Sequence, residues 1–279
     1  MPLLRILCLH GYTQNALSFS KKTAVLRRTL KDVADLVYIT APHIVPIPTL
    51  ETPEARENDQ LENLEPEAVP YGWWRGPDYK GFDESLTVLQ QVLEKQGPFD
   101  GVLGFSQGAS MASLLQLLLE RPHLSPTMNG YKHNPFKFAI MVSGFEPRNE
   151  ALISWYTNKY PVLQSSQLHE KTTENGVGER IAETTTTTTT TTTMHQDDKT
   201  HEEPPLPSPS PLAYLYGVQG ASMHIIGRND VIIEPERSEG LLKHYTNKKP
   251  VVLYHDGGHY LPSNAASRQA YKTFVQSFI

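Results

Sequence analysis

Apolar residues along this chain gather in six short runs, separated by stretches in which apolar positions recur at helical spacing. The runs cover residues 3–9, 36–40, 99–105, 136–143, 221–227 and 251–256. The first run is almost continuously apolar, which is typical of a strand buried on both faces of a sheet. We therefore expect the six runs to form the strands of one buried sheet.

Helical spacing fills most of the intervals between these runs. It predicts helices over residues 16–31, 83–96, 107–120, 235–246 and 264–278. Asp83 suits the N-cap of its helix, and Gly97 suits the end of the same helix. Strands that alternate with helices in this way predict an α/β fold, with a mainly parallel sheet flanked by helices.

Residues 43–80 depart from this alternation. They combine repeated prolines, an acidic run and the pair Trp73–Trp74. Such a composition favours a long ordered loop, or lid-like segment, over a core element. The two indoles either line a pocket beneath the lid, where large aromatic area binds alkyl chains, or pack in the core and anchor the lid to the sheet.

A second departure covers residues 165–211. It contains ten consecutive threonines, Thr184–Thr193, and ends in the stretch PPLPSPSP. This composition buries too little apolar surface to offset the entropy of ordering, so we expect a disordered low-complexity insertion. A linker between two domains is the alternative. Because neither flank has a complete set of elements, we interpret residues 1–279 as a single domain.

Charge and cysteine usage narrow the classes of partner and location. The net charge is −5 at pH 7 and no basic patch stands out, which argues against nucleic acid as a partner. Cys8 is the single cysteine, so no internal disulfide can form and a reducing compartment is expected. The first residues lack the features of a signal peptide, and no apolar run approaches the roughly 20 residues that span a bilayer. We expect a cytoplasmic protein without a membrane span.

The candidate chemistry begins at Ser106, in the stretch FDGVLGFSQGA. Residues 104–108 match the pattern G-x-S-x-G between a predicted strand and a predicted helix, which is the context that a nucleophile elbow requires. A sharp turn there exposes the serine hydroxyl, and the helix N-terminus directs N–H groups toward a developing oxyanion. Ser106 is therefore the expected nucleophile.

A serine nucleophile needs a base, and His259 is the best placed of the eleven histidines. It lies in HDGGHYLP, after the last predicted strand and before the last helix. Two preceding glycines allow a tight turn that presents the imidazole over the sheet edge. His10 follows the first strand, and we expect it to hydrogen-bond the turn there.

The third group must orient the histidine and stabilise its cation. Asp230 follows the strand at 221–227 and matches the chain order Ser, acid, His. Asp256 competes, but it lies only three residues before His259 on one turn. Asp100 precedes the strand that leads to Ser106 and falls at the wrong end of the sheet. Asp230 could also cap the following helix.

An oxyanion hole requires two donors. The backbone N–H of Gln107, directly after Ser106, is expected to supply one of them. The turn HGYTQN after the first strand is expected to supply the other, through the N–H of Tyr12. A plain tight turn is the alternative interpretation of that stretch.

The chain resembles the FSH family of serine hydrolases, within the α/β-hydrolase fold, over nearly its whole length outside 165–211. The stretches that carry the resemblance, in chain order, are LHGYTQN, YGWW, GPFDGVLGFSQGAS, SGF, HIIGRND and HDGGHYLP. Acyl-protein thioesterases also have the elbow GFSQG and an HG after the first strand, but they lack the YGWW element.

The resemblance implies a carboxylesterase or thioesterase that needs neither metal nor organic cofactor, with its triad at Ser106, Asp230 and His259. Its substrate would be a small-molecule or carrier-bound acyl compound, and some fungal relatives resemble thioesterases of polyketide secondary metabolism. Two other classes stay open, because fold does not fix function. The chain could be a catalytically idle hydrolase-fold protein that binds a ligand, or one that docks partners through its Thr/Pro tract.

Overall fold

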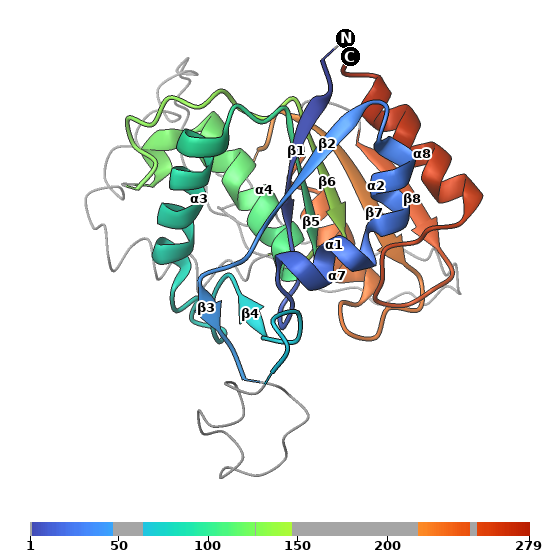
Figure 1. The fold of residues 1–279 in the computed structure, drawn as a ribbon, viewed down its shortest axis with the longest axis horizontal. Helices are drawn as coiled ribbons and strands as arrows, with labels where there is room; N and C mark the ends of the chain where they lie inside the picture. Colours follow the sequence, from blue (N-terminus) through green and yellow to red (C-terminus); the bar gives the residue numbers. More distant parts are fainter. Residues whose placement is uncertain (1, 47–63, 126, 147–216, 246–249) are drawn as a thin grey trace, which may run out of the picture.

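The computed structural model describes residues 2–46, 64–125, 127–146, 217–245 and 250–279. Its main sheet has six strands in the order β2-β1-β5-β6-β7-β8, and every neighbouring pair is parallel (Figure 1). These strands are β1 Leu4–Leu9, β2 Ala34–Ile39, β5 Gly101–Phe105, β6 Phe138–Val142, β7 Ala221–Gly227 and β8 Val251–His255. Each of the six apolar runs therefore contributes one strand, and the predicted mainly parallel α/β architecture is confirmed.

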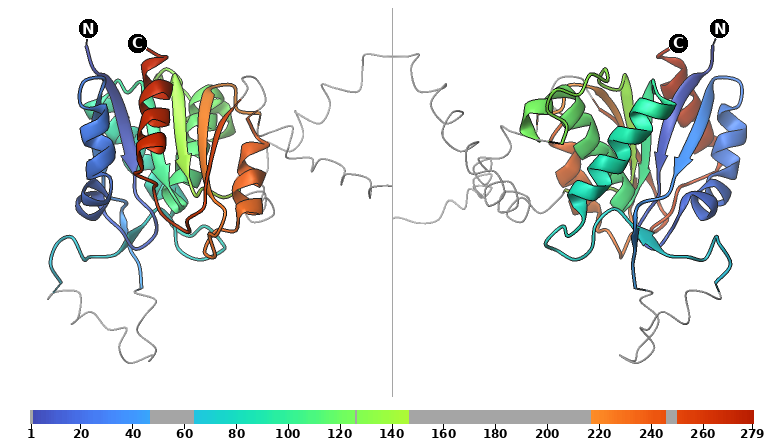
Figure 2. Two further views of the ribbon diagram at one scale, coloured as in Figure 1. Left: turned by 90° about the vertical axis from the view of Figure 1, so that its right-hand side faces the viewer. Right: turned by 60° about the vertical axis from the view of Figure 1, so that its left-hand side comes forward.

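Helices cover both faces of this sheet (Figure 2). One layer contains α1 Ala16–Lys22, α2 Ala24–Leu30 and α8 Ala265–Gln276, and the other contains α3 Phe82–Gln96, α4 Gln107–Glu120 and α7 Pro235–Leu242. A short 3₁₀ turn, Pro122–Leu124, follows α4. Side chains of β1 alternate between the layers, because Ile6 and Cys8 face the first and Leu7 and Leu9 face the second.

The single helix expected over 16–31 is in fact two helices that meet at Thr23. The Thr23 hydroxyl donates to the carbonyl of Phe19 at 2.8 Å and lies 2.6 Å from the hydroxyl of Tyr38 on β2. This side chain competes with the backbone of the helix and ends α1 there. The expected N-cap at Asp83 is also wrong, because α3 begins after Gly81, whose φ of +92° is the left-handed conformation that glycine tolerates.

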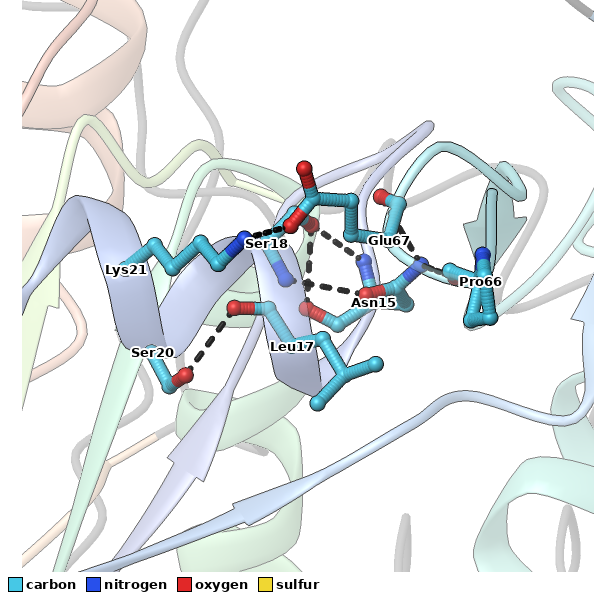
Figure 3. A network of polar contacts seen from close by, with 7 residues as sticks. All are labelled: Asn15, Leu17, Ser18, Ser20, Lys21, Pro66 and Glu67. Atoms are coloured by element: carbon cyan, nitrogen blue, oxygen red, sulfur yellow. Dashed lines mark hydrogen bonds and ion pairs between the residues drawn. The ribbon is translucent and has the colours of Figure 1, made fainter. Parts of the chain in front are cut away.

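A turn within the lid-like segment is fixed to the start of α1 (Figure 3). The Asn15 amide nitrogen donates to the carbonyls of Pro66, Glu67 and Val69, at 3.0, 3.2 and 2.9 Å. Its side-chain oxygen also caps α1, because it accepts the N–H of Ser18. A single side chain therefore starts a helix and holds the turn that leads toward Trp73.

A small antiparallel ribbon is formed by two strands, one before and one after this anchored turn. Its strands, β3 His43–Ile44 and β4 Tyr71–Gly72, lie beyond the carboxyl ends of the main strands (Figure 1). Residues 47–63 and the expected disordered insertion at 165–211 lie outside the described residues. In the described part of the chain, no helix has both the length and the apolar character that crossing a membrane requires.

Two of the buried histidines in the described residues, His10 and His224, have strongly lowered pKa values. The His224 ring on β7 is 2% exposed, contacts the Tyr245 ring at 4.9 Å, and has Nε2 3.1 Å from the Ser222 hydroxyl. Burial lowers the pKa of His224 to about 3 and that of His10 to about 4, because both rings would lose hydration if charged. Both side chains are therefore neutral in the folded protein at physiological pH.

The free energy of unfolding should fall as the pH drops below about 6.5. The unfolded chain binds a proton at both histidines below that pH. In the folded chain, His10 binds a proton only near pH 4 and His224 only near pH 3. Each histidine then costs about 1.4 kcal/mol of stability per pH unit. Urea unfolding between pH 7.5 and 5 measures this slope. His224→Phe keeps a ring against Tyr245 and should make the slope shallower, and an unchanged slope in that variant would contradict the assignment.

Candidate active site

The candidate site lies at the edge where the parallel strands end. Because all six main strands run the same way, the segments after β1, β5, β7 and β8 emerge at one edge. The chain also reverses its winding between β1 and β5, since β2 lies on one side of β1 and β5 to β8 follow on the other. Ligands bind open α/β sheets at such a switch point.

Ser106 forms a strained turn between β5 and α4. Its backbone angles, φ of 53° and ψ of −120°, lie in a region that residues other than glycine rarely adopt. Its N–H donates to the carbonyl of Val142 on β6 at 2.9 Å, and its own carbonyl accepts the N–H of Ala109 at 2.9 Å. The neighbouring strand and helix together hold the strained conformation that a nucleophile elbow requires.

The two glycines of the G-x-S-x-G stretch are required by close packing. A Cβ at Gly104 would lie 2.2 Å from the carbonyl oxygen of Gly108 and 2.5 Å from the backbone of Ala109. A Cβ at Gly108 would lie 2.2 Å from the Leu9 carbonyl oxygen and 2.3 Å from that of His10. The first glycine lets α4 fold back on β5, and the second lets α4 approach the end of β1.

The structure brings Asp230 and His259 together from the segments that follow two different strands, β7 and β8. Nδ1 of His259 lies 2.7 Å from Oδ2 of Asp230, and the other carboxylate oxygen accepts the N–H groups of Ile232 and Ile233 at 3.0 and 2.9 Å. Asp230 is only 4% exposed. The three hydrogen bonds occupy both oxygens and hold the carboxylate against His259.

The protonation states in this pair follow from its contacts. Burial by itself raises the pKa of Asp230, but the hydrogen bonds from Ile233, His259 and Ile232 outweigh burial and leave that pKa below its ordinary value. An ionised carboxylate only accepts hydrogen bonds, so Nδ1 of His259 carries the proton. Nε2 then keeps a free lone pair, which is the state that a general base requires.

Phe105 links this pair to the elbow. Its ring centroid lies 4.8 Å from that of His259, and its other contacts include Gly11, where a Cβ would approach within 2.9 Å of the ring. No hydrogen bond joins the Ser106 hydroxyl to His259 in the described residues. Such contacts commonly shorten only when substrate binds.

The rival residues occupy other places. Both nitrogens of His10 are engaged, because Nε2 accepts the N–H of Ala41 at 2.9 Å and Nδ1 donates to the carbonyl of Gly11 at 2.7 Å. Asp256 is 93% exposed and pairs with Arg228 at 3.4 Å. Asp100 lies at the amino ends of the strands, where it accepts the N–H of Arg5. Asp230 does not cap α7, whose N-cap is Glu234.

The expected oxyanion donors lie on two adjoining segments. Gln107 is the first residue of α4, and Tyr12 lies in the turn after β1 that the Gln14 N–H closes on the carbonyl of Gly11 at 3.2 Å. The contact of Gly108 with the end of β1 brings these segments together. Both backbones are therefore at the edge that carries Ser106.

Trp73 and Trp74 are both buried, at 0% and 5% exposed. The Trp73 backbone N–H donates to Oε1 of Gln107 at 2.8 Å, and its indole Nε1 donates to the carbonyl of His10 at 2.9 Å. The Trp74 ring stacks on that of Tyr79 with centroids 5.1 Å apart. In this structure, Trp73 anchors the lid-like segment to the end of β1.

Two contributions to the site were not inferred from the sequence. One is the Phe105 ring against His259. The other is the Gln107 side chain, which also donates from Nε2 to the carbonyl of Trp74 at 3.0 Å. A polar residue at the start of a mostly apolar helix was the signal for the second. Nothing local signals the first, because an aromatic residue ending a strand is also ordinary core.

The chemistry available here is acid–base and nucleophilic. Among the described residues, no cluster of three or more His, Cys, Asp or Glu side chains could hold a metal ion. The candidate side chains for chemistry are a serine hydroxyl, an imidazole and a carboxylate. Their arrangement suits transfer of an acyl group through a covalent serine intermediate.

Comparison with known proteins identifies the family. The family described as "Serine hydrolase (FSH1)" matches residues 1–271. The chain is 31% identical to the zebrafish (Danio rerio) protein named "Esterase OVCA2" over 288 aligned residues, covering 99% of this chain and 97% of the relative. The human (Homo sapiens) protein of the same name is 30% identical over 289 aligned residues, covering 99% of this chain and 96% of that relative.

A solved structure gives the same architecture. Acyl-protein thioesterase 2 of Zea mays superposes with a TM-score of 0.52 at 16% identity, covering 99% of this chain and 94% of the other. At that identity the likeness shows the fold alone, which is the α/β-hydrolase fold. Taken with the family match over nearly the whole sequence, these comparisons establish that the chain belongs to the FSH1 family of serine hydrolases.

Proposed function

We propose that this protein hydrolyses carboxylic esters or thioesters of acyl compounds, with Ser106 as nucleophile, His259 as general base and Asp230 as the orienting acid. The observation that carries the proposal is the 2.7 Å contact between His259 Nδ1 and Asp230 Oδ2, at the strand edge that also holds the strained Ser106 turn. The relatives named esterases support ester hydrolysis as the general reaction.

The mechanism follows from the contacts. The Ser106 hydroxyl attacks the acyl carbonyl carbon while Nε2 of His259 takes its proton, and the resulting imidazolium is stabilised by the ionised Asp230. The carbonyl oxygen becomes an oxyanion that accepts hydrogen bonds from the backbone N–H groups of Tyr12 and Gln107. His259 then protonates the leaving alcohol or thiol, and a water molecule hydrolyses the acyl-enzyme by the same steps in reverse.

The substrate is an acyl compound that is either small or bound to a carrier. No group in the described site distinguishes an oxygen from a sulfur leaving atom, because the oxyanion and the acyl-enzyme are common to both. Thioester hydrolysis is therefore the finer form of the same proposal. It includes the release of carrier-bound polyketide acyl groups that the family resemblance implied.

The test combines turnover with active-site labelling. We expect the wild-type protein to hydrolyse members of a p-nitrophenyl ester series from C2 to C16, with the optimum reporting the size of the acyl pocket. Acyl thioesters of matched chain length would show whether sulfur is preferred. A fluorophosphonate should stop turnover and add one equivalent of mass to the peptide that contains Ser106.

Two outcomes would contradict the proposal. Labelling at a residue other than Ser106 would refute the assignment of the nucleophile. Stoichiometric labelling or acylation of Ser106 without repeated turnover, on both esters and thioesters, would instead favour the catalytically idle, ligand-binding alternative.

A further inference from the structure

We propose that the side chains of Gln107 and Trp73 form a positioning pair that sets the separation of the two oxyanion donors. This inference rests on the proposed hydrolase function and assigns roles to groups that the mechanism itself does not use. Neither side chain needs to touch the substrate, because each acts through the backbone of a donor segment.

The first step is the unusual use of the Gln107 side chain. Gln107 is 5% exposed at the start of a helix that is otherwise almost entirely buried. Its amide oxygen accepts the N–H of Trp73 and its amide nitrogen donates to the carbonyl of Trp74, at 2.8 and 3.0 Å. A flipped amide would face donor with donor and acceptor with acceptor, so the orientation is fixed. The side chain thus holds one turn of the lid-like segment against α4.

The second step is the hold that Trp73 has on the end of β1. The indole Nε1 of Trp73 donates to the carbonyl of His10 at 2.9 Å, and the backbone carbonyl of Trp73 accepts the Ser85 hydroxyl at 2.5 Å. His10 is fixed in turn by the N–H of Ala41. Because His10 is followed directly by Gly11 and Tyr12, this indole fixes the segment from which the second oxyanion donor emerges.

The third step is a second connection between α4 and the end of β1. We call the closed set of contacts among Gln107, Trp73, His10 and Gly108 the circuit. The carbonyl oxygen of His10 also faces Gly108, where a Cβ would lie only 2.3 Å away. One path from α4 to the end of β1 is this direct contact. The other runs from the Gln107 side chain through Trp73 to His10. Two connections between the same segments fix both their distance and their angle, whereas one contact would leave the segments free to tilt.

The size of the effect follows from oxyanion-hole chemistry. Loss of one oxyanion donor typically lowers kcat by about 10²–10³, and a misplacement of 1 Å can cost about 10². Breaking one connection of the circuit should displace a donor without removing it. We therefore expect kcat to fall by roughly 10- to 100-fold, with KM changing by less than about threefold.

Two variants break the circuit at different points. Trp73→Phe keeps an aromatic ring in the core but removes the indole N–H that binds His10. Gln107→Glu keeps an acceptor for the Trp73 N–H but places a carboxylate oxygen against the Trp74 carbonyl. Ile140→Val provides a stability control, since the side chain of Ile140 on β6 is fully buried on the opposite face of the sheet.

The decisive readout is binding of a trifluoromethyl ketone, which forms a tetrahedral oxyanion on the serine, compared with the methyl ketone of the same chain. In both circuit variants the trifluoromethyl ketone should lose affinity by the same factor as kcat, while the methyl ketone binds as before. Ile140→Val should change neither kcat nor the affinity for the trifluoromethyl ketone relative to that for the methyl ketone. Circuit variants that lose stability yet keep kcat and trifluoromethyl ketone affinity would overturn the inference.

Gln107→Glu offers a second readout that a purely structural role would not move. A protonated glutamic acid can again donate to the Trp74 carbonyl, so the ratio of variant to wild-type kcat should rise as the pH falls. A ratio that is flat with pH would count against the inference. Failure of the proposed function is distinguishable, because then the wild-type protein itself would neither turn over esters nor bind the trifluoromethyl ketone, and both proposals would fall.

Discussion

Replacing Ser106 with alanine is expected to lower kcat for ester hydrolysis by about 10⁴-fold or more, because the acyl-enzyme can no longer form. Stability should be retained, since alanine has the same backbone restrictions as serine at φ 53° and the Ser106 N–H bond to Val142 is kept. Kinetics on the best ester of the series, together with urea unfolding, measure both quantities. Near-normal turnover in this variant would remove Ser106 from the mechanism.

The losses in kcat caused by replacing Ser106 and by replacing His259 should not multiply when both residues are replaced. His259→Ala alone should cost a similar factor, and the double variant should be no slower than either single variant, because nucleophile and base act in one step. Losses that multiply in the double variant would show that the two side chains act independently.

Asp230→Asn is expected to lower kcat by roughly 10³- to 10⁴-fold with little change in fold. The asparagine oxygen can still accept the N–H groups of Ile232 and Ile233, so the turn survives. Its amide nitrogen would donate to Nδ1 of His259, which moves the ring proton to Nε2. That tautomer cannot accept the proton of Ser106.

Asp256→Asn is the matched control for this prediction. Asp256 lies three residues before His259 in the sequence, yet it is 93% exposed and pairs with Arg228. Its substitution should leave kcat within about twofold, since an exposed ion pair of this kind contributes little. A large loss in Asp256→Asn together with a small loss in Asp230→Asn would reverse the assignment of the acid.

The burial of Trp73 also bears on how the lid-like segment works. Asn15 holds its turn at residues 66–69, and Trp73 holds the stretch after β4. These anchors leave the residues from 64 to 74 fixed on the same edge that carries the expected oxyanion donors. The indole of Trp74 stacks on Tyr79 beside Phe145, and its role as the aromatic lining of an acyl pocket stays a prediction.

Much of the architecture was predictable from the sequence, because buried strands and helices place apolar residues at regular intervals along the chain. Apolar runs located all six main strands within about two residues at each end, and helical spacing located α4 at its observed bounds. The elbow at 104–108 was equally visible, since only glycine fits the backbone approaches at Gly104 and Gly108. The order of strands and loops then predicted that Ser106, Asp230 and His259 would follow strands at one edge.

Tertiary contacts decided where the first predicted helix breaks, which carboxylate meets His259, and which buried polar groups bind one another. The break at Thr23 depends on the Tyr38 hydroxyl of β2, and the choice between Asp230 and Asp256 depends on which carboxylate the fold turns toward His259. Likewise, the bond from Trp73 to His10 joins residues 63 apart in the chain, and the bonds from Gln107 to the two tryptophans span more than 30 residues. Local pattern reports which side chains are buried, because periodicity follows the geometry of a single element. Which buried polar groups meet depends on how separate elements pack, and no local pattern records that.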